Sequence, residues 1–302
     1  MDTSKMRRTM RHLVAVMLLA GGARDAAGQA PSTDVFLAPL RRVRDSIVVG
    51  PARNITNRAG YDNQPSFTPD SRAILYTAAA DGQTDIWRYD IAAKRSSQLT
   101  HTSESEYSAT VMPGGRRMSV IRVERDSTQR LWSFAVDGSD PQILLSALKP
   151  VGYHVWLGPA KLVTFVLGNP ATLHVIESDG SADTIRSRDI GRALLRVPGQ
   201  DAFSYTHRDS AKALWIMTQP VLGDGAAVVV KAPSDNEYHA WTPDGVLLTV
   251  TQGKLVRWNR AIDATSGWLP VADISTGVKN ISRLAVSPDG KWLAFVAEPV
   301  SP

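Results

Sequence analysis

The chain has 302 residues, a net charge of +5, 43% hydrophobic residues, 21% charged residues and no cysteine. This is the composition of an ordinary globular protein, which excludes disordered and fibrous classes, and the length is enough to bury a large core. The lack of cysteine excludes disulfides, thiolate metal sites and a cysteine nucleophile.

The first 30 residues have the pattern of a secretory signal peptide. Four basic residues ending at Arg11 precede an apolar run over 13–20, and small residues follow up to Ala30. We expect cleavage after Gly28 or after Ala30, and a periplasmic or secreted mature protein. The apolar run is shorter than the roughly 20 residues that a spanning helix needs, so no membrane span is predicted.

The leader also accounts for most of the net charge, because it holds five basic and two acidic residues and leaves about +2 for the mature chain. The mature chain contains no dense basic stripe or basic-aromatic module of the kind that neutralises phosphates. We therefore expect no nucleic-acid partner.

Two segments after the leader, 33–37 and 53–56, have the sequence of short β-strands. They resemble the later segments 84–88 and 97–100, which both belong to a repeat. This similarity indicates that the N-terminal segments are two strands of one repeat whose other strands lie elsewhere.

A turn rich in Pro, Asp and Gly recurs about every 44 residues along the chain. Proline presets φ for the first corner of a tight turn, aspartate bonds back to the backbone, and glycine accepts a positive φ. The six turns begin at Pro69, Pro113, Gly158, Pro198, Pro243 and Pro288.

Each turn joins two β-rich runs, such as 66–68 and 73–77, and further strands such as 85–89 and 97–100 follow. Four strands per repeat is the geometry of a β-propeller blade. The sixth repeat contains only its first two strands before Pro302. We predict an all-β, six-bladed β-propeller over residues 31–302 with four-stranded blades, the last blade being closed by the N-terminal strands.

These repeats resemble a known family. The run 65–71 (PSFTPDS), followed by 85–87 (DIW) and 98–100 (QLT), is similar to the WD-repeat-like element of TolB-like six-bladed propellers, and 285–290 (AVSPDG) repeats it. The resemblance covers about residues 33–302. It implies a periplasmic or secreted propeller that contacts proteins or small ligands.

Two relatives with definite functions carry parts that this sequence does not contain. TolB has an α/β domain ahead of its propeller, for which there is no room here. Peptidases with a similar propeller need a Gly-x-Ser-x-Gly nucleophile motif, and none occurs in this sequence.

No catalytic, metal-ligating or cofactor-binding motif is present, and we predict no cofactor. His154 and His239 fall at comparable points on the innermost strands of blades 3 and 5, so they could approach one another across the central channel. The alternative is that both are ordinary hydrogen-bonded strand histidines.

The best candidate surface is the funnel at the start of the innermost strands, where side chains of every blade meet. Tyr153 lies at this level, and the solvated ends of ordinary strands are the alternative interpretation. The predicted ligand-binding residues are Asn63, Gln64, Tyr107, His154, Arg192, Glu237, Tyr238, His239 and Arg283.

We therefore expect an exported, monomeric, non-catalytic propeller that binds an envelope or extracellular protein or a small ligand at this funnel. The alternative is a metal-dependent propeller enzyme of the lyase, hydrolase or lactonase type with a channel-bound ion. A third possibility is a structural or sensor module whose catalytic partner is a separate chain.

Overall fold

A computed structural model describes residues 32–233, 236–263, 265 and 267–300. The predicted signal peptide lies outside the described residues. Within them the regular structure is β, with 25 strands arranged in six sheets. The described residues include no helix of the length and apolarity needed to cross a membrane.

Each sheet is one blade, and its strands follow one another from the inner to the outer edge. The first three blades contain β4 (Asp62–Phe67), β5 (Ala73–Ala80), β6 (Gln83–Asp90) and β7 (Arg95–Gln98); β8 (Ser105–Val111), β9 (Arg117–Val123), β10 (Gln129–Ala135) and β11 (Gln142–Leu145); and β12 (Val151–Trp156), β13 (Lys161–Val166), β14 (Thr172–Glu177) and β15 (Asp183–Arg188).

The other three blades follow the same order, except that the last one is built from both ends of the chain. They contain β16 (Ile190–Arg196), β17 (Ala202–Arg208), β18 (Leu214–Pro220) and β19 (Ala227–Lys231); β20 (Ala240–Trp241), β21 (Leu247–Thr251), β22 (Lys254–Trp258) and β23 (Leu269–Asp273); and β24 (Val278–Val286), β25 (Trp292–Pro299), β1 (Asp34–Val43), β2 (Ser46–Val49) and β3 (Arg53–Asn54).

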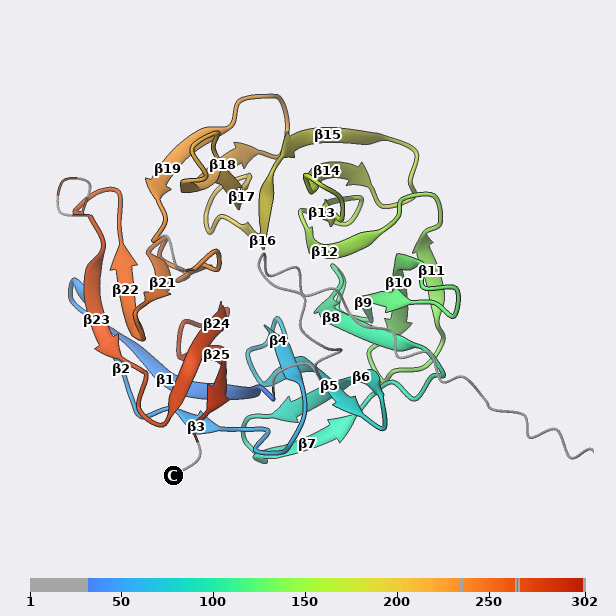
Figure 1. The fold of residues 1–302 in the computed structure, drawn as a ribbon, viewed down its shortest axis with the longest axis horizontal. Coiled ribbons are helices and arrows are strands. Elements are labelled where there is room, and N and C mark those ends of the chain that lie inside the picture. Colours follow the sequence, from blue (N-terminus) through green and yellow to red (C-terminus); the bar gives the residue numbers. More distant parts are fainter. Residues whose placement is uncertain (1–31, 234–235, 264, 266, 301–302) are drawn as a thin grey trace, which may run out of the picture. The chain divides into compact units, whose positions relative to one another are not determined.

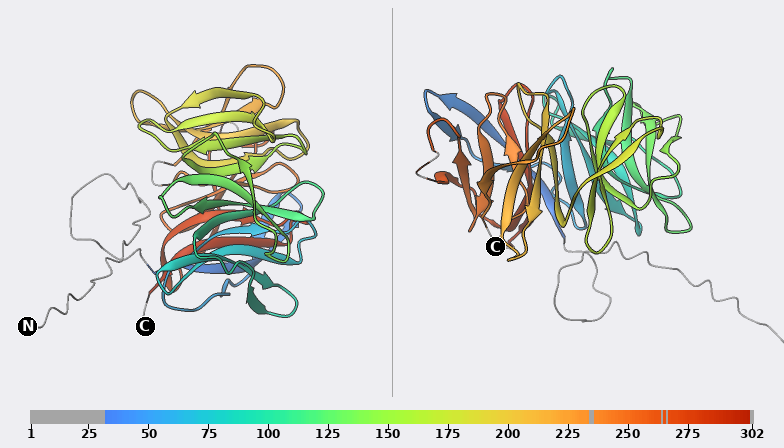
Figure 2. Two further views of the ribbon diagram at one scale, coloured as in Figure 1. Left: turned by 90° about the vertical axis from the view of Figure 1, so that its right-hand side faces the viewer. Right: turned by 90° about the horizontal axis from the view of Figure 1, so that it is seen from above.

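The six blades form a ring, and the first strand of each blade lies nearest the axis (Figure 1). Seen from the side, the sheets stand beside one another with their strands running along the axis (Figure 2). The predicted six-bladed, all-β propeller with four-stranded blades is therefore confirmed.

The ring closes through strand β1, which pairs with β25 in antiparallel register from Asp34 opposite Ala297 to Pro39 opposite Trp292. Strand β3 pairs with the other edge of β1 and becomes the outer strand of the blade. Closure of the last blade by the N-terminal strands is confirmed.

One side-chain contact shows that the N-terminal strands occupy the same place as the outer strands of blade 1. Thr56 Oγ1 donates to Asp34 Oδ1 at 3.0 Å, and Thr100 Oγ1 donates to Asp85 Oδ1 at 3.3 Å. Each threonine also accepts the backbone N–H that follows its aspartate. The repeated Thr-Asp pair that makes the segments similar in sequence is thus a repeated clamp between the third and fourth strands.

Strand β1 is longer than the sequence suggested. It continues to Val43 and forms a hairpin with β2. Among the described residues the other repeats contain no equivalent hairpin, so the repeat pattern did not predict this extension. Its Arg42 lies 3.3 Å from a carboxylate oxygen of Asp244 in blade 5. The hairpin therefore adds a contact between blade 6 and its neighbour.

The core is divided among the blade interfaces. The buried apolar residues form six clusters among the described residues, and each cluster joins one pair of adjacent blades. In the cluster between blades 5 and 6, the ring of Phe36 stacks on that of Phe295 at 5.4 Å between centroids. An N-terminal side chain therefore completes the packing of the C-terminal strand.

We predict that Phe36→Ala lowers the free energy of unfolding by about 3 kcal/mol or more, because it leaves a cavity in the closing blade. Urea denaturation of the purified protein measures this. Val43→Ala, on the exposed part of the same strand, serves as the control and should cost less than about 0.5 kcal/mol. Equal small losses in both variants would show that the closure does not depend on this packing.

Candidate functional site

Six side chains, one from each blade, gather where the innermost strands begin. They are half-buried and connected by contacts or by electrostatic interactions across the ring axis. We call this group the axial cluster, and it consists of Tyr61, Tyr107, Tyr153, Arg192, Tyr238 and Arg283.

Arg283, on β24 of blade 6, is the central residue of the axial cluster. Its Nη2 donates to Tyr153 Oη at 2.8 Å, and its guanidinium carbon lies 4.8 Å from the ring centroid of Tyr153 and 4.6 Å from that of Tyr238. Tyr153 belongs to blade 3, which lies three blades away from blade 6 in either direction around the ring. The side chain of Arg283 therefore reaches across the axis.

The backbone explains how this side chain is aimed. Arg283 has φ of 55°, in the left-handed region that non-glycine residues seldom adopt, and the register of β24 against β25 shifts there. Gln64 and Ser108 have φ of 57° and 54° at the same repeat position, with the same kind of shift. A bulge of this kind re-aims the side chain of an inner strand.

Blades 4 and 5 supply the charged half of the site. Glu237 accepts from Arg192 Nη1 at 2.9 Å and from Arg208 Nη2 at 3.2 Å, so two cations share one carboxylate. Together with Arg283 this places three positive charges and one negative charge in this half of the site, a surplus of two. The tyrosines do not offset it, because burial raises the pKa of Tyr61 and of Tyr238 and keeps both phenols neutral near pH 7.

Gly191 makes room for this carboxylate. A Cβ atom at Gly191 would lie 2.1 Å from Thr206 Oγ1 and 2.9 Å from Glu237 Oε2. Contacts this short cannot persist, so Glu237 depends on a neighbour without a side chain.

We predict that Gly191→Ala lowers the free energy of unfolding by about 1–3 kcal/mol, because the new methyl group displaces buried Thr206 and the Glu237 carboxylate. Chemical denaturation measures the change. Gly158→Ala is the matched control, because its Cβ would meet nothing within 4 Å. An equal effect of both substitutions would contradict the tight fit.

The structure brings together five of the nine residues that the sequence predicted, namely Tyr107, Arg192, Glu237, Tyr238 and Arg283. Gln64 lies at the same level, and its Oε1 accepts from Thr77 Oγ1 at 2.7 Å and from Ser108 N at 3.1 Å. Asn63 is buried, and its Oδ1 accepts the backbone N–H of Gln64 at 2.9 Å. Asn63 is thus bonded within the inner strand of blade 1, and Gln64 connects β5 of blade 1 with β8 of blade 2.

The two histidines of the prediction lie elsewhere, between blades. His154 Nε2 lies 2.6 Å from Ser119 Oγ, which also accepts from Trp156 Nε1. His239 Nε2 lies 2.9 Å from Ser204 Oγ, in the equivalent place at the next-but-one blade interface. Each ring is buried against the preceding blade and is not brought to the other across the axis.

Burial also fixes the charge state of these histidines. It lowers the pKa of His154 to about 4 and that of His239 to about 3, so both rings are neutral at physiological pH. They match the alternative of hydrogen-bonded strand histidines. No group of three or more His, Asp or Glu side chains suited to a metal ion occurs among the described residues.

Two residues of the site were not foreseen. Tyr61 precedes β4, where Thr33 forms an isolated bridge with it, and Arg208 ends the second strand of blade 4. Neither stands at the repeat position of the other site residues, so the repeat alone gives no signal for them. A shallow surface pocket over 196–201 lies at the opposite end of β16 from Arg192.

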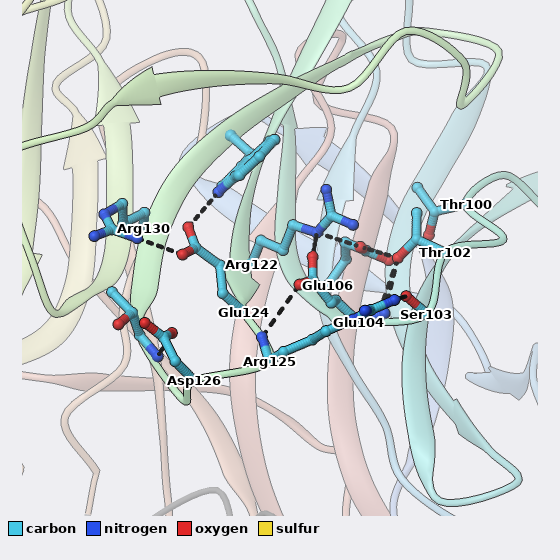
Figure 3. A network of polar contacts seen from close by, with 12 residues as sticks. Thr100, Thr102, Ser103, Glu104, Glu106, Arg122, Glu124, Arg125, Asp126 and Arg130 are labelled. Carbon is cyan, nitrogen blue, oxygen red and sulfur yellow. Dashed lines mark hydrogen bonds and ion pairs between the residues drawn. The ribbon is translucent and has the colours of Figure 1, made fainter.

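A second polar network lies on blade 2, next to Tyr107. Figure 3 shows Arg122 directed at Glu104 and Glu106, with Nε–oxygen distances of 2.6 and 3.3 Å. Glu106 is fully buried and shares one guanidinium with Glu104. Burial raises the pKa of Glu106 to about 7. Thr102 and Arg122 reduce this rise without cancelling it.

This raised pKa predicts a pH dependence of stability. The folded protein holds the Glu106 proton more tightly than the unfolded chain, so the stabilisation is present below pH of about 4.3 and is lost as pH rises toward 7. At 1.36 kcal/mol per pKa unit the loss is at most about 4 kcal/mol. Glu106→Gln should make the free energy of unfolding flatter between pH 5 and 8.

Denaturation at pH 5, 6, 7 and 8 measures both slopes. Asp45→Asn, at an exposed hairpin position, controls for the removal of one carboxylate. The assignment is contradicted when Glu106→Gln retains the wild-type slope. Asp62, whose pKa burial raises to about 6, should leave a residual slope of the same sign in the variant.

No protein-family model matches the sequence, and no curated protein is significantly similar to it. Solved structures do resemble the fold. A putative TolB from Agrobacterium tumefaciens aligns with a TM-score of 0.67 at 12% identity, over 90% of this chain and 100% of that chain. A TolB from Acinetobacter baumannii aligns with a TM-score of 0.55 at 10% identity, over 87% of this chain, which spans 63% of that protein's length.

Enzymes share the same architecture. A gluconolactonase from Xanthomonas campestris aligns with a TM-score of 0.60 at 10% identity, over 91% of this chain and 99% of that chain. An oligogalacturonate lyase in complex with manganese aligns with a TM-score of 0.57 at 13% identity, over 83% and 80%. At these identities the likeness extends to the fold alone: this chain is a six-bladed propeller similar in structure to TolB propellers, a lactonase and a lyase.

Proposed function

We propose that this chain is an exported, non-catalytic propeller of the TolB-like type that binds a protein partner or a small ligand at the axial cluster. The leader over residues 1–30 supports export to the periplasm or the exterior. The repeat motifs and the similarity of the fold to TolB propellers support the type. We further propose a monomer without a cofactor.

One observation carries the binding proposal: every blade sends a polar or aromatic side chain to the same end of the axis. Four of these six side chains are tyrosines, which combine apolar area with a hydrogen-bonding tip and lose little entropy on binding. The surrounding blade interfaces hold them in place from all sides. A preformed set of amphipathic side chains on a rigid scaffold is suited to recognition.

The fold also occurs in metal-dependent enzymes, so a lyase, hydrolase or lactonase with a channel-bound ion is the competing function. It is favoured by the similarity to the lyase with manganese and to the gluconolactonase. The axial cluster differs from what such chemistry uses, because its side chains are phenols and guanidinium groups and not the carboxylate and imidazole groups that usually bind divalent ions.

A binding screen on the mature protein tests the proposal. Small metabolites are assayed by thermal shift and envelope proteins by capture, each with the wild type, with Tyr238→Ala at the axis and with Gln200→Ala at the far end of blade 4. We expect a ligand whose binding falls at least about tenfold in Tyr238→Ala and is unchanged in Gln200→Ala.

Two results would contradict the proposal. One is a ligand whose binding depends on Gln200 and not on Tyr238. The other is a stoichiometric metal ion in the purified protein together with turnover of a lactone or an oligouronide, which would establish the enzyme instead. Circular dichroism of each variant confirms that the fold is retained before binding is compared.

A further inference from the structure

We propose that the ligand of the axial cluster carries a carboxylate, and that the guanidinium of Arg283, held by Tyr153 and Tyr238, is the group that binds it. This inference rests on the proposed function, because it names the chemistry of the ligand at the same site.

The first argument is the missing counter-charge. The buried and half-buried arginines of the described residues usually contact a carboxylate, as Arg122 does with Glu104, Arg192 with Glu237 and Arg257 with Asp263. No carboxylate of a described residue lies within 4.0 Å of the nitrogens of Arg283, and an arginine keeps its charge at any physiological pH. Removing this charge from water without an anion is unfavourable, so an external anion would restore the balance.

The second argument is the number of donors. The guanidinium has five N–H groups, and Tyr153 Oη is its one hydrogen-bond partner among the described residues. The remaining N–H groups form a planar fork that matches the two oxygens of a carboxylate. The ring of Tyr238 lies 4.6 Å from the guanidinium carbon and leaves these N–H groups unused, and a carboxylate accepts up to four hydrogen bonds.

The third argument is preorganisation. The positive φ of Arg283 and its contacts with two aromatic rings hold the guanidinium in one place before a ligand arrives. A group fixed in this way loses little conformational entropy on binding. The surplus positive charge at Arg192, Arg208 and Glu237 adds an attractive field for an anion at the same end of the axis.

The charge and shape favour a carboxylate over a phosphate group. Phosphate sites in proteins gather several backbone N–H groups or a helix N-terminus. The axial cluster offers one guanidinium without a carboxylate partner among the described residues, together with tyrosine side chains, which suit a planar group with a single negative charge. A small organic acid and the C-terminus of a peptide both present this group, and the experiment separates them.

Isothermal titration of the mature protein tests the inference. The probes are succinate, D-glucuronate and a tripeptide with a free C-terminus, each compared with a neutral counterpart: D-glucose for the acids and the same tripeptide with an amidated C-terminus. Inorganic phosphate and sodium chloride report on non-specific anion binding. We expect at least one carboxylate probe to bind saturably and its neutral counterpart not to bind. Binding of the acids alone indicates that the ligand is a small organic acid. Binding of the tripeptide alone indicates that the ligand is the C-terminus of a peptide.

The matched variants are Arg283→Gln and Arg53→Gln. Arg53 also lies near two aromatic rings, at 5.9 Å from Tyr89 and 5.8 Å from Trp292, without a carboxylate partner, but it stands on the outermost strand of blade 6. We expect Arg283→Gln to weaken carboxylate binding about 10- to 100-fold, since a charged hydrogen bond is lost. Arg53→Gln should leave carboxylate binding unchanged. If Arg283 had only a structural role, both substitutions would lower stability and neither would change carboxylate binding specifically.

Tyr153→Phe keeps the ring and removes the hydroxyl, so it tests the same contact when Arg283→Gln does not fold; a several-fold loss of affinity is expected. Binding of carboxylates that is equal in wild type and Arg283→Gln overturns the inference. Saturable binding of a neutral ligand or an amidated peptide at the axial cluster, with no carboxylate bound, also overturns it but leaves the proposed function standing. When neither the screen nor these probes find a ligand at the axis, both fail.

Discussion

The pairing of β1 with β25 is the constraint on which the rest of the structure depends. A blade of four strands has two apolar faces, and each of the six buried clusters is shared by two adjacent blades. Without β1 the last blade would lack the strand that packs against blade 1 through Val35 and Leu37 and against blade 5 through Phe36. The ring would then expose two apolar faces and an unpaired strand edge.

Closure also decides whether a site exists at all. Arg283 belongs to the blade that both termini build, and its partner Tyr153 lies on the opposite side of the ring. The distance between these two side chains is fixed by all the blade interfaces between them, in either direction. The axial cluster, and with it the proposed binding surface, is therefore a property of the closed ring and of no single blade.

The fold was predictable because its signals are local and repeated. Six turns at regular spacing and the Thr-Asp pair shared by 33–56 and 84–100 were sufficient for the number of blades and for the closure. The level of the axial cluster along the inner strands was predictable for the same reason. The position of a residue within its repeat indicates how far along the strand it lies. Arg283, Tyr238 and Tyr107 were placed at this level in that way.

The direction of a side chain was less accessible from the sequence. His154 follows Tyr153 directly, yet its ring is buried between blades while Tyr153 contacts Arg283 across the axis. The bulges at Gln64, Ser108 and Arg283 change which face of the inner strand the following side chains point to. None of these three positions holds a glycine, the residue that would have indicated a positive φ in the sequence. Tyr61 precedes β4 and still belongs to the axial cluster. Contacts of this kind between distant parts of the chain can be identified only in the assembled ring.

The six blades are similar in backbone and send four tyrosines and two arginines to the axis, and the two kinds of residue are unevenly distributed around the ring. Blades 1 to 3 contribute Tyr61, Tyr107 and Tyr153, which offer aromatic faces. Blades 4 to 6 contribute Arg192, Tyr238 and Arg283, with the surplus positive charge. Binding at Arg283, which contacts Tyr153 of blade 3 and Tyr238 of blade 5, would stabilise the closed ring by an amount that grows with the free ligand concentration relative to Kd.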